Sequence, residues 1–161
     1  MATSETAQKR GLRMALPTLA PEFYKAMINL DAAARRGLNP ALTELVKIRA
    51  SQINHCAFCI NMYTRDARLE GESEERLYLL NAWEESPTYF TAKEQAALAL
   101  TEAVTVLTDG FVPDAVYDRA AEHFESAELA QLVSLIIAIN AWNRISVTTR
   151  MSPGNPPSEE L

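Results

Sequence analysis

Residues 40–71 read PALTELVKIRASQINHCAFCINMYTRDARLEG, and this stretch contains both cysteines of the chain. The preceding pair Asn39–Pro40 is typical of an N-cap followed by a first helical position. A short break at Asn54–His55 precedes a second helical segment, which starts at Cys56 and which Gly71 ends. The first segment carries a broad apolar stripe at helical spacing, formed by Leu42, Leu45, Val46, Ile48 and Ile53. The stretch therefore predicts two consecutive helices, with the cysteine pair at the start of the second.

The rest of the chain carries further helix start and stop signals, and no apolar alternation long enough to predict a strand. Thr91 and Glu94 form a Thr-x-x-Glu capping box, and Ser126 is expected to be the N-cap of a long final helix. Besides the two helices above, we predict helices at residues 21–36, 73–83, 92–107, 113–124 and 127–148. The predicted fold class is all-α, a helical bundle of about seven helices joined by short connections.

The length of 161 residues suits one domain. We predict a single all-α domain over residues 1–161, with an N-terminal arm at 1–15, a helical core at 16–150 and a flexible tail at 151–161. The tail is rich in proline and polar residues, a composition that favours disorder.

Charge and hydropathy exclude several classes of partner. Fifteen basic residues against twenty-one acidic ones give a net charge of −6, which opposes binding to nucleic acid or to anionic membranes. No apolar run of signal-peptide length follows the basic residues near the N-terminus, and the most apolar window, Leu132–Trp142, is too short to span a bilayer. The expected location is cytoplasmic, where thiols are kept reduced, so a cycling or metal-binding cysteine pair is favoured over a structural disulfide.

The predicted final helix is apolar on nearly all sides, which indicates burial all around it. A domain of this size surrounds one helix only with difficulty, so we expect a subunit interface to cover part of it, as in a homo-oligomer. The alternative is a central core helix within a monomer.

The cysteines, Cys56 and Cys59, allow three interpretations. At the start of a helix, unpaired N–H groups and a partial positive charge favour the thiolate, and the spacing lets the two sulfurs bond, as in a dithiol/disulfide couple. The pair could also be two small buried residues. A zinc site would need two further ligands, while His55 is adjacent but points elsewhere and His123 is distant in sequence. We expect no metal and no dissociable organic cofactor.

Two residues join the cysteines by geometry. Tyr63 follows Cys59 by four positions and shares its helix face. Glu44 lies on the preceding helix and returns toward the cysteines if the two helices pack antiparallel; there it could exchange protons, and its burial would raise its pKa. The alternative for Glu44 is a solvated charge on a helix surface.

The segment Glu44–Arg68 resembles the signature of the alkyl hydroperoxidase D (AhpD)-like branch of the carboxymuconolactone decarboxylase family. In that pattern a Glu precedes Cys-x-x-Cys by twelve residues, and a His follows the second Cys by four. The resemblance extends more loosely over most of the chain, including Asn140–Arg150. It implies an all-α AhpD-like fold, assembly into trimers or hexamers, and thiol peroxidase activity in which the cysteine pair becomes a disulfide. A thiol or dihydrolipoyl-type reductant would then reduce the disulfide again.

The resemblance also implies roles for single residues. Cys59 would attack the hydroperoxide substrate, Cys56 would resolve the sulfenic acid to the disulfide, and Glu44 would relay protons. The helix start instead favours Cys56 as the thiol of lower pKa, so the identity of the nucleophile stays open. Tyr63 occupies the position of the family's His, and His55 is the nearest imidazole. We hypothesise that Tyr63 positions a thiolate or water by hydrogen bonding while Glu44 transfers the proton.

The predicted function is therefore a thiol-dependent peroxidase or disulfide oxidoreductase that acts on hydroperoxides. One alternative is a redox-sensing or binding oligomer with little or no peroxidase activity, which the Tyr63 substitution keeps open. The other is a lactone decarboxylase of the name-giving branch, against which the cysteine pair argues, because that branch does not rely on one.

Overall fold

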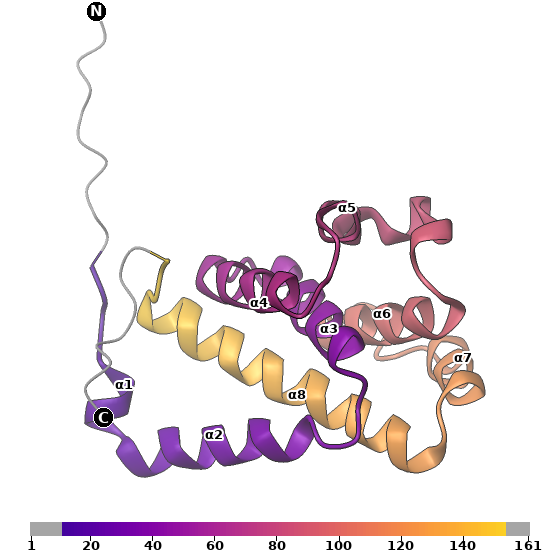
Figure 1. Ribbon diagram of the computed structural model, residues 1–161. Coiled ribbons are helices and arrows are strands. Elements are labelled where there is room, and N and C mark those ends of the chain that lie inside the picture. The colour runs from indigo at the N-terminus through magenta and orange to yellow at the C-terminus, as the bar shows by residue number, and fades with distance from the viewer. Residues whose placement is uncertain (1–10, 154–161) are drawn as a thin grey trace, which may run out of the picture.

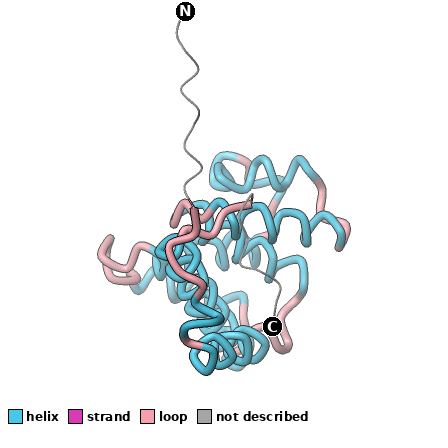
Figure 2. The backbone as a smooth tube through the Cα atoms, turned by 90° about the vertical axis from the view of Figure 1, so that its left-hand side faces the viewer, coloured by secondary structure: helices cyan, strands magenta, loops and turns pink. Residues whose placement is uncertain are grey.

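The computed structural model describes residues 11–153, and its described part is all-α, which confirms the predicted fold class. Figure 2 shows helices joined by loops, with no strand in this part of the chain. The helices are α1 (Leu16–Leu19), α2 (Pro21–Ala34), α3 (Pro40–Ile53), α4 (Ala57–Leu69), α5 (Glu74–Leu79), α6 (Ala92–Thr105), α7 (Asp114–His123) and α8 (Ser126–Thr149), with two 3₁₀ helices, η1 (Leu80–Glu85) and η2 (Pro87–Tyr89).

Local capping signals predicted several helix starts. The Asn39 side chain accepts a hydrogen bond from the Leu42 N–H at 3.1 Å. The Thr91–Glu94 capping box is present with both of its hydrogen bonds. The expected Ser126 cap is wrong, because Glu125 holds the N-cap position of α8 without a side-chain hydrogen bond and Ser126 is already helical.

Two other details differ from the sequence prediction. The helix expected at 73–83 ends as α5 at Leu79 and continues as the 3₁₀ helix η1, because the backbone of Ala82 leaves helical geometry. The short helix α1 was not predicted, since four residues carry too little periodicity to detect. Parts of the predicted arm (1–10) and tail (154–161) lie outside the described residues, so the domain boundaries stay a prediction.

Helix α8 runs through the centre of the bundle (Figure 1). It packs against α2 on one side and against α3, α4, α6 and α7 elsewhere. Its buried positions include Leu132, Leu135 and Ile136, while Ile137 and Val147 stay about half exposed. Helices of the same chain therefore cover most of the apolar surface of α8. This is what the alternative prediction, a central core helix within a monomer, expected.

The exposed large apolar residues are spread over the described chain, and four of them, Leu19, Phe23, Ile28 and Leu30, lie on α1 and α2. Association of copies through apolar helices stays a prediction.

By length and composition α8 is the one helix of the described chain that could cross a membrane. Half of its most apolar window is buried inside the protein, however, and a core helix passes the same test. The window Leu132–Trp142 thus belongs to a longer helix than its apolar run alone indicated.

Helix α3 is buried along most of its length because it contacts α4, α6, α8 and η1. Its apolar residues Leu45, Val46 and Ile48 form part of two neighbouring core clusters. Its polar residues Glu44 and Lys47 are buried as well. Buried polar groups need hydrogen-bond partners inside the protein.

A buried hydrogen-bond network ties the end of α3 to α8. The Asn54 side-chain amide donates to Oδ1 of Asn140 and of Asn143, each at 3.0 Å. The Asn143 amide donates in turn to Ser51 Oγ at 2.9 Å, and Asn140 donates to Thr105 Oγ1 at 3.0 Å. The network fixes the turn before Cys56 against the central helix.

We expect Asn143→Ala to lower the free energy of unfolding by about 2–3 kcal/mol, because the change removes two buried hydrogen bonds and leaves a void. Urea denaturation at neutral pH measures the effect. The matched control is Asn29→Ala on the exposed surface of α2, which should change stability by less than about 0.5 kcal/mol. Equal stability of the two variants would show that the network does not hold the turn.

Candidate active site

The turn between α3 and α4 positions the first cysteine. His55 takes a left-handed backbone conformation with φ of 54°, which is uncommon for a residue other than glycine. The chain then reverses, and the Cys56 N–H donates to the Ser51 carbonyl at 2.9 Å. Cys56 thereby becomes the N-cap of α4, in agreement with the predicted helix start.

Cys56 and Cys59 are joined by a disulfide bond, with their Cα atoms 5.3 Å apart. Both are almost fully buried, at 2% and 1% exposure. The Cys59 N–H lies 3.3 Å from Cys56 Sγ, so the sulfur accepts a hydrogen bond from the first turn of the helix. That donor and the helix N-terminus favour a negative charge on Cys56 when the bond is reduced. Within the described residues, no cluster of three or more His, Cys, Asp or Glu side chains is arranged to hold a metal ion.

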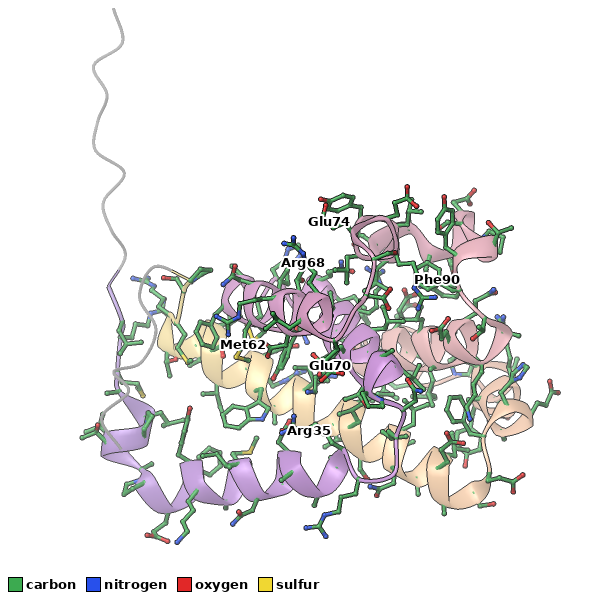
Figure 3. All side chains as sticks on the ribbon, viewed as in Figure 1. Arg35, Met62, Arg68, Glu70, Glu74 and Phe90 are labelled. Atoms are coloured by element: carbon green, nitrogen blue, oxygen red, sulfur yellow. A yellow bond between two sulfur atoms is a disulfide. The ribbon has the colours of Figure 1, made fainter. Side chains whose placement is uncertain are left out.

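Cys59 lines a pocket of about 370 Å³ between α2, α4 and α8. Figure 3 places Met62 between α4 and α8, and Arg35 between α2 and the helices above it. Half of the lining residues are apolar or aromatic: Tyr24, Ile28, Ala32, Phe58, Met62, Trp142 and Met151. The polar part of the wall consists of Asp31, Arg35, Lys47, Cys59, Tyr63, Asp66 and Ser146. Such a lining suits an organic molecule that carries one polar reactive group.

Two contacts shape this wall. Tyr24 packs edge to face against Trp142, with ring centroids 5.4 Å apart, and so closes one side of the pocket. Arg35 pairs with Asp31 at 2.9 Å.

Glu44 is buried beside Lys47. Its Oε1 lies 3.1 Å from Lys47 Nζ, and the lysine side chain is 1% exposed. Its Oε2 has no hydrogen-bond partner in the described structure. Burial raises the pKa of Glu44, Lys47 opposes the shift, and the charges of Asp66 and Glu70 add to it. The carboxyl is therefore easier to protonate than an ordinary glutamate, as a proton relay requires.

Lys47 connects this carboxyl to the pocket. Its ammonium lies 4.6 Å from the centre of the Tyr63 ring, a cation–π contact, and Lys47 itself lines the pocket. Burial raises the pKa of Tyr63 well above its ordinary value, and the carboxylates of Asp31 and Glu44 contribute to the rise. Tyr63 therefore keeps its proton at neutral pH, and it can donate a hydrogen bond but cannot act as a base.

The site residues predicted from the sequence differ in where they lie relative to the pocket. Cys59 and Tyr63 line the pocket, and Cys56 is bonded to Cys59 without lining it. Glu44 is buried, as the antiparallel packing of α3 and α4 required, but it reaches the pocket only through Lys47. His55 is exposed and does not line the pocket.

Sequence reasoning missed five polar residues of the pocket, of which two contact predicted site residues: Asp31, Arg35, Asp66, and the two in contact, Lys47 and Ser146. Lys47 follows Glu44 by three positions, a spacing that places the two side chains together on a helix and could have signalled the pair. Ser146, whose Oγ lies 3.5 Å from Cys59 Sγ, comes from α8 and carries no local signal.

This fold and cysteine pair define an AhpD-like member of the carboxymuconolactone decarboxylase family. The chain belongs to that family, because residues 21–103 match the family's sequence pattern. It is 43% identical over 136 residues to the uncharacterized protein YdfG of Bacillus subtilis, a match that covers 84% of this chain and 92% of YdfG. It is 33% identical over 102 residues to the uncharacterized protein YnjA of Escherichia coli, covering 63% of this chain and 55% of YnjA.

Two solved structures share the fold. One is a protein of unknown function from Agrobacterium tumefaciens, described as a candidate antioxidant defence protein AhpD. It is 36% identical, with a TM-score of 0.84 over 88% of this chain and 98% of that one. The other is an uncharacterized peroxidase-related protein from Silicibacter at 19% identity. Its TM-score of 0.68, over 82% of this chain and 69% of that one, shows likeness of fold alone. The resemblance found in the sequence is confirmed.

The raised pKa of Glu44 predicts a specific dependence of stability on pH. Since the folded pKa lies above the unfolded value of about 4.3, the stabilisation from the bound proton is complete below that value and is lost as the pH rises through the folded pKa. The stability of the wild type relative to Glu44→Gln should therefore fall as the pH increases from about 4 to about 7. Urea denaturation across this range measures the difference.

The control for this measurement is Glu22→Gln, which removes the same charge from the exposed start of α2. A wild-type advantage over Glu44→Gln that stays constant or grows with pH would contradict the prediction.

Proposed function

We propose that the protein is a thiol-dependent peroxidase or disulfide oxidoreductase whose working couple is Cys56 and Cys59. The observation that carries this proposal is the disulfide at the start of α4, one cysteine of which lines a pocket. A buried carboxyl of raised pKa close to the same pocket supports it, because each turnover must move protons.

In the first proposed step, the Cys59 thiolate attacks the terminal oxygen of a hydroperoxide ROOH. The O–O bond breaks, the alkoxide takes up one proton and leaves as the alcohol ROH, and Cys59 becomes a sulfenic acid. Cys59 is assigned the attack because it is the cysteine that lines the pocket.

In the second step, the Cys56 thiolate attacks the sulfenic sulfur of Cys59. The S–S bond forms and hydroxide leaves as water after protonation, so one peroxide and two thiols give one alcohol, one water and one disulfide. An external dithiol, such as a dihydrolipoyl-type group, then reduces the disulfide by thiol–disulfide exchange and is itself oxidised.

The proton needed for ROH is assigned to Glu44 and Lys47. Glu44 is hydrogen-bonded to Lys47, and Lys47 borders the pocket. Tyr63 is limited to donating a hydrogen bond, because burial raises its pKa. This protein has Tyr63 where the family has His. We therefore assign the proton transfer to Glu44, with Lys47 between its carboxyl and the pocket.

The cysteines give the first test of this function. With dithiothreitol as reductant, the wild type should consume tert-butyl hydroperoxide steadily, and Cys59→Ser should lose at least about a hundredfold of that rate because the attacking sulfur is absent. In the absence of dithiothreitol, Cys56→Ser should form the sulfenic acid once and then stall, because no thiol is left to resolve it. Peroxide consumption and a sulfenic-acid trapping reagent measure the two effects.

Wild-type turnover no higher than that of Cys59→Ser would end the peroxidase proposal. If one equivalent of peroxide nevertheless oxidised both thiols without steady turnover, the result would contradict the proposed enzymatic function and favour a redox sensor instead.

Tyr63 gives the second test. Tyr63→His restores an imidazole with an ordinary pKa near 6.5, which can both accept and return a proton, so turnover near neutral pH should rise about tenfold. Tyr63→Phe retains the ring without the hydroxyl and should bring no gain. Unchanged turnover in Tyr63→His would show that this position does not limit the relay.

A further inference from the structure

The two sulfurs of the disulfide have different hydrogen-bond environments. Cys56 Sγ is approached by a backbone N–H of α4, at 3.3 Å. Cys59 Sγ lies 3.5 Å from Ser146 Oγ, on the central helix α8. Ser146 is 2% exposed, so water does not compete freely for its hydroxyl.

Ser146 Oγ differs in its contact from several other hydroxyl groups of this protein. Those hydroxyl side chains, also within helices, donate back to the carbonyl four residues earlier. Ser51 donates to Lys47 O at 2.7 Å, Ser134 to Ala130 O at 2.8 Å, and Thr149 to Ile145 O at 2.8 Å. Ser146 Oγ lies instead 3.5 Å from the sulfur of Cys59. A serine that leaves its local acceptor is available to the sulfur.

We propose that the Ser146 hydroxyl donates a hydrogen bond to the reduced Cys59 sulfur and thereby stabilises the thiolate that attacks the substrate. The proposal deepens the proposed peroxidase function and rests on it for the identity of the attacking thiol. A hydrogen bond to a charged acceptor inside a protein is worth more than one to a neutral acceptor, so the donor favours the thiolate over the thiol.

This inference addresses the conflict over the nucleophile. The helix start favours a thiolate at Cys56. Ser146 supplies a separate donor for Cys59, the cysteine that lines the pocket. Each cysteine thus has its own hydrogen-bond donor, and Cys59 can attack while Cys56 resolves.

Charged and titratable groups around the pocket also act on Cys59. They come from α2, α3 and α4: Tyr24, Asp31, Arg35, Lys47, Tyr63 and Asp66. Arg35 is paired with Asp31, and Lys47 with the buried Glu44. A change at Ser146 leaves all of them in place, so comparing variants at this position isolates the effect of the hydroxyl.

The experiment uses Cys56→Ser, in which Cys59 is the single remaining thiol of the chain. The thiol pKa is measured from the ultraviolet absorbance of the thiolate and from the rate of iodoacetamide alkylation against pH. Ser146→Ala should raise the Cys59 pKa by about one unit, which lowers alkylation at neutral pH about tenfold. Ser134→Ala, which removes a hydroxyl that donates to the α8 backbone, should leave the pKa unchanged.

A second pair, Ser146→Thr and Ser146→Val, has matched shape with and without the hydroxyl, and it decides the question if the alanine variant does not fold. The valine variant should show the higher Cys59 pKa by about one unit. Equal pKa values within both folded pairs would overturn the role of Ser146. This readout needs no peroxide turnover, so failure of the proposed peroxidase and failure of this inference are distinguishable.

Discussion

The turn from Asn54 to Cys56 is the constraint on which the site depends. It reverses the chain so that α4 packs along α3, and the Asn54 side chain fixes it to Asn140 and Asn143 of α8. Because the turn is held in place, Cys56 becomes the N-cap of α4 and Cys59 Sγ lies 3.5 Å from Ser146 Oγ. The same reversal brings α4, with Tyr63, against the face of α3 that carries Lys47.

The sequence could predict interactions between residues that are close along the chain, and it could not predict those between residues that are far apart. The Asn39 cap, the Thr91–Glu94 box and the start of α4 at Cys56 are determined within one helical turn, and their residue types reveal them. The contact between Cys59 and Ser146 joins residues 87 positions apart, so it depends on how α8 crosses α4 and no local pattern contains it. The divided helix after Leu79 likewise depends on the backbone at Ala82, where the residue type gives no warning.

Burial of charge explains why Lys47 is important to the site. A lysine with 1% of its side chain exposed requires a nearby anion, and Glu44 supplies it. In turn, the ammonium counteracts the burial that raises the pKa of Glu44. The pair therefore holds a proton-exchanging carboxyl inside the core, and Tyr63 covers the ammonium with its ring. The family pattern of Glu, two Cys and His does not include this lysine, although its position in α3 makes it the link between Glu44 and the pocket.

Access to the sulfurs limits what can reduce the disulfide. Both are buried, and the pocket of about 370 Å³ that reaches Cys59 is walled by α2, α4 and α8. Thiol–disulfide exchange requires the attacking sulfur to approach along the S–S axis, in direct contact with the sulfur it attacks. The dihydrolipoyl-type reductant of the proposed function is a slender dithiol, a shape that suits a pocket of this size. Under the proposed function, the organic hydroperoxide and the reductant would then use the same opening in turn.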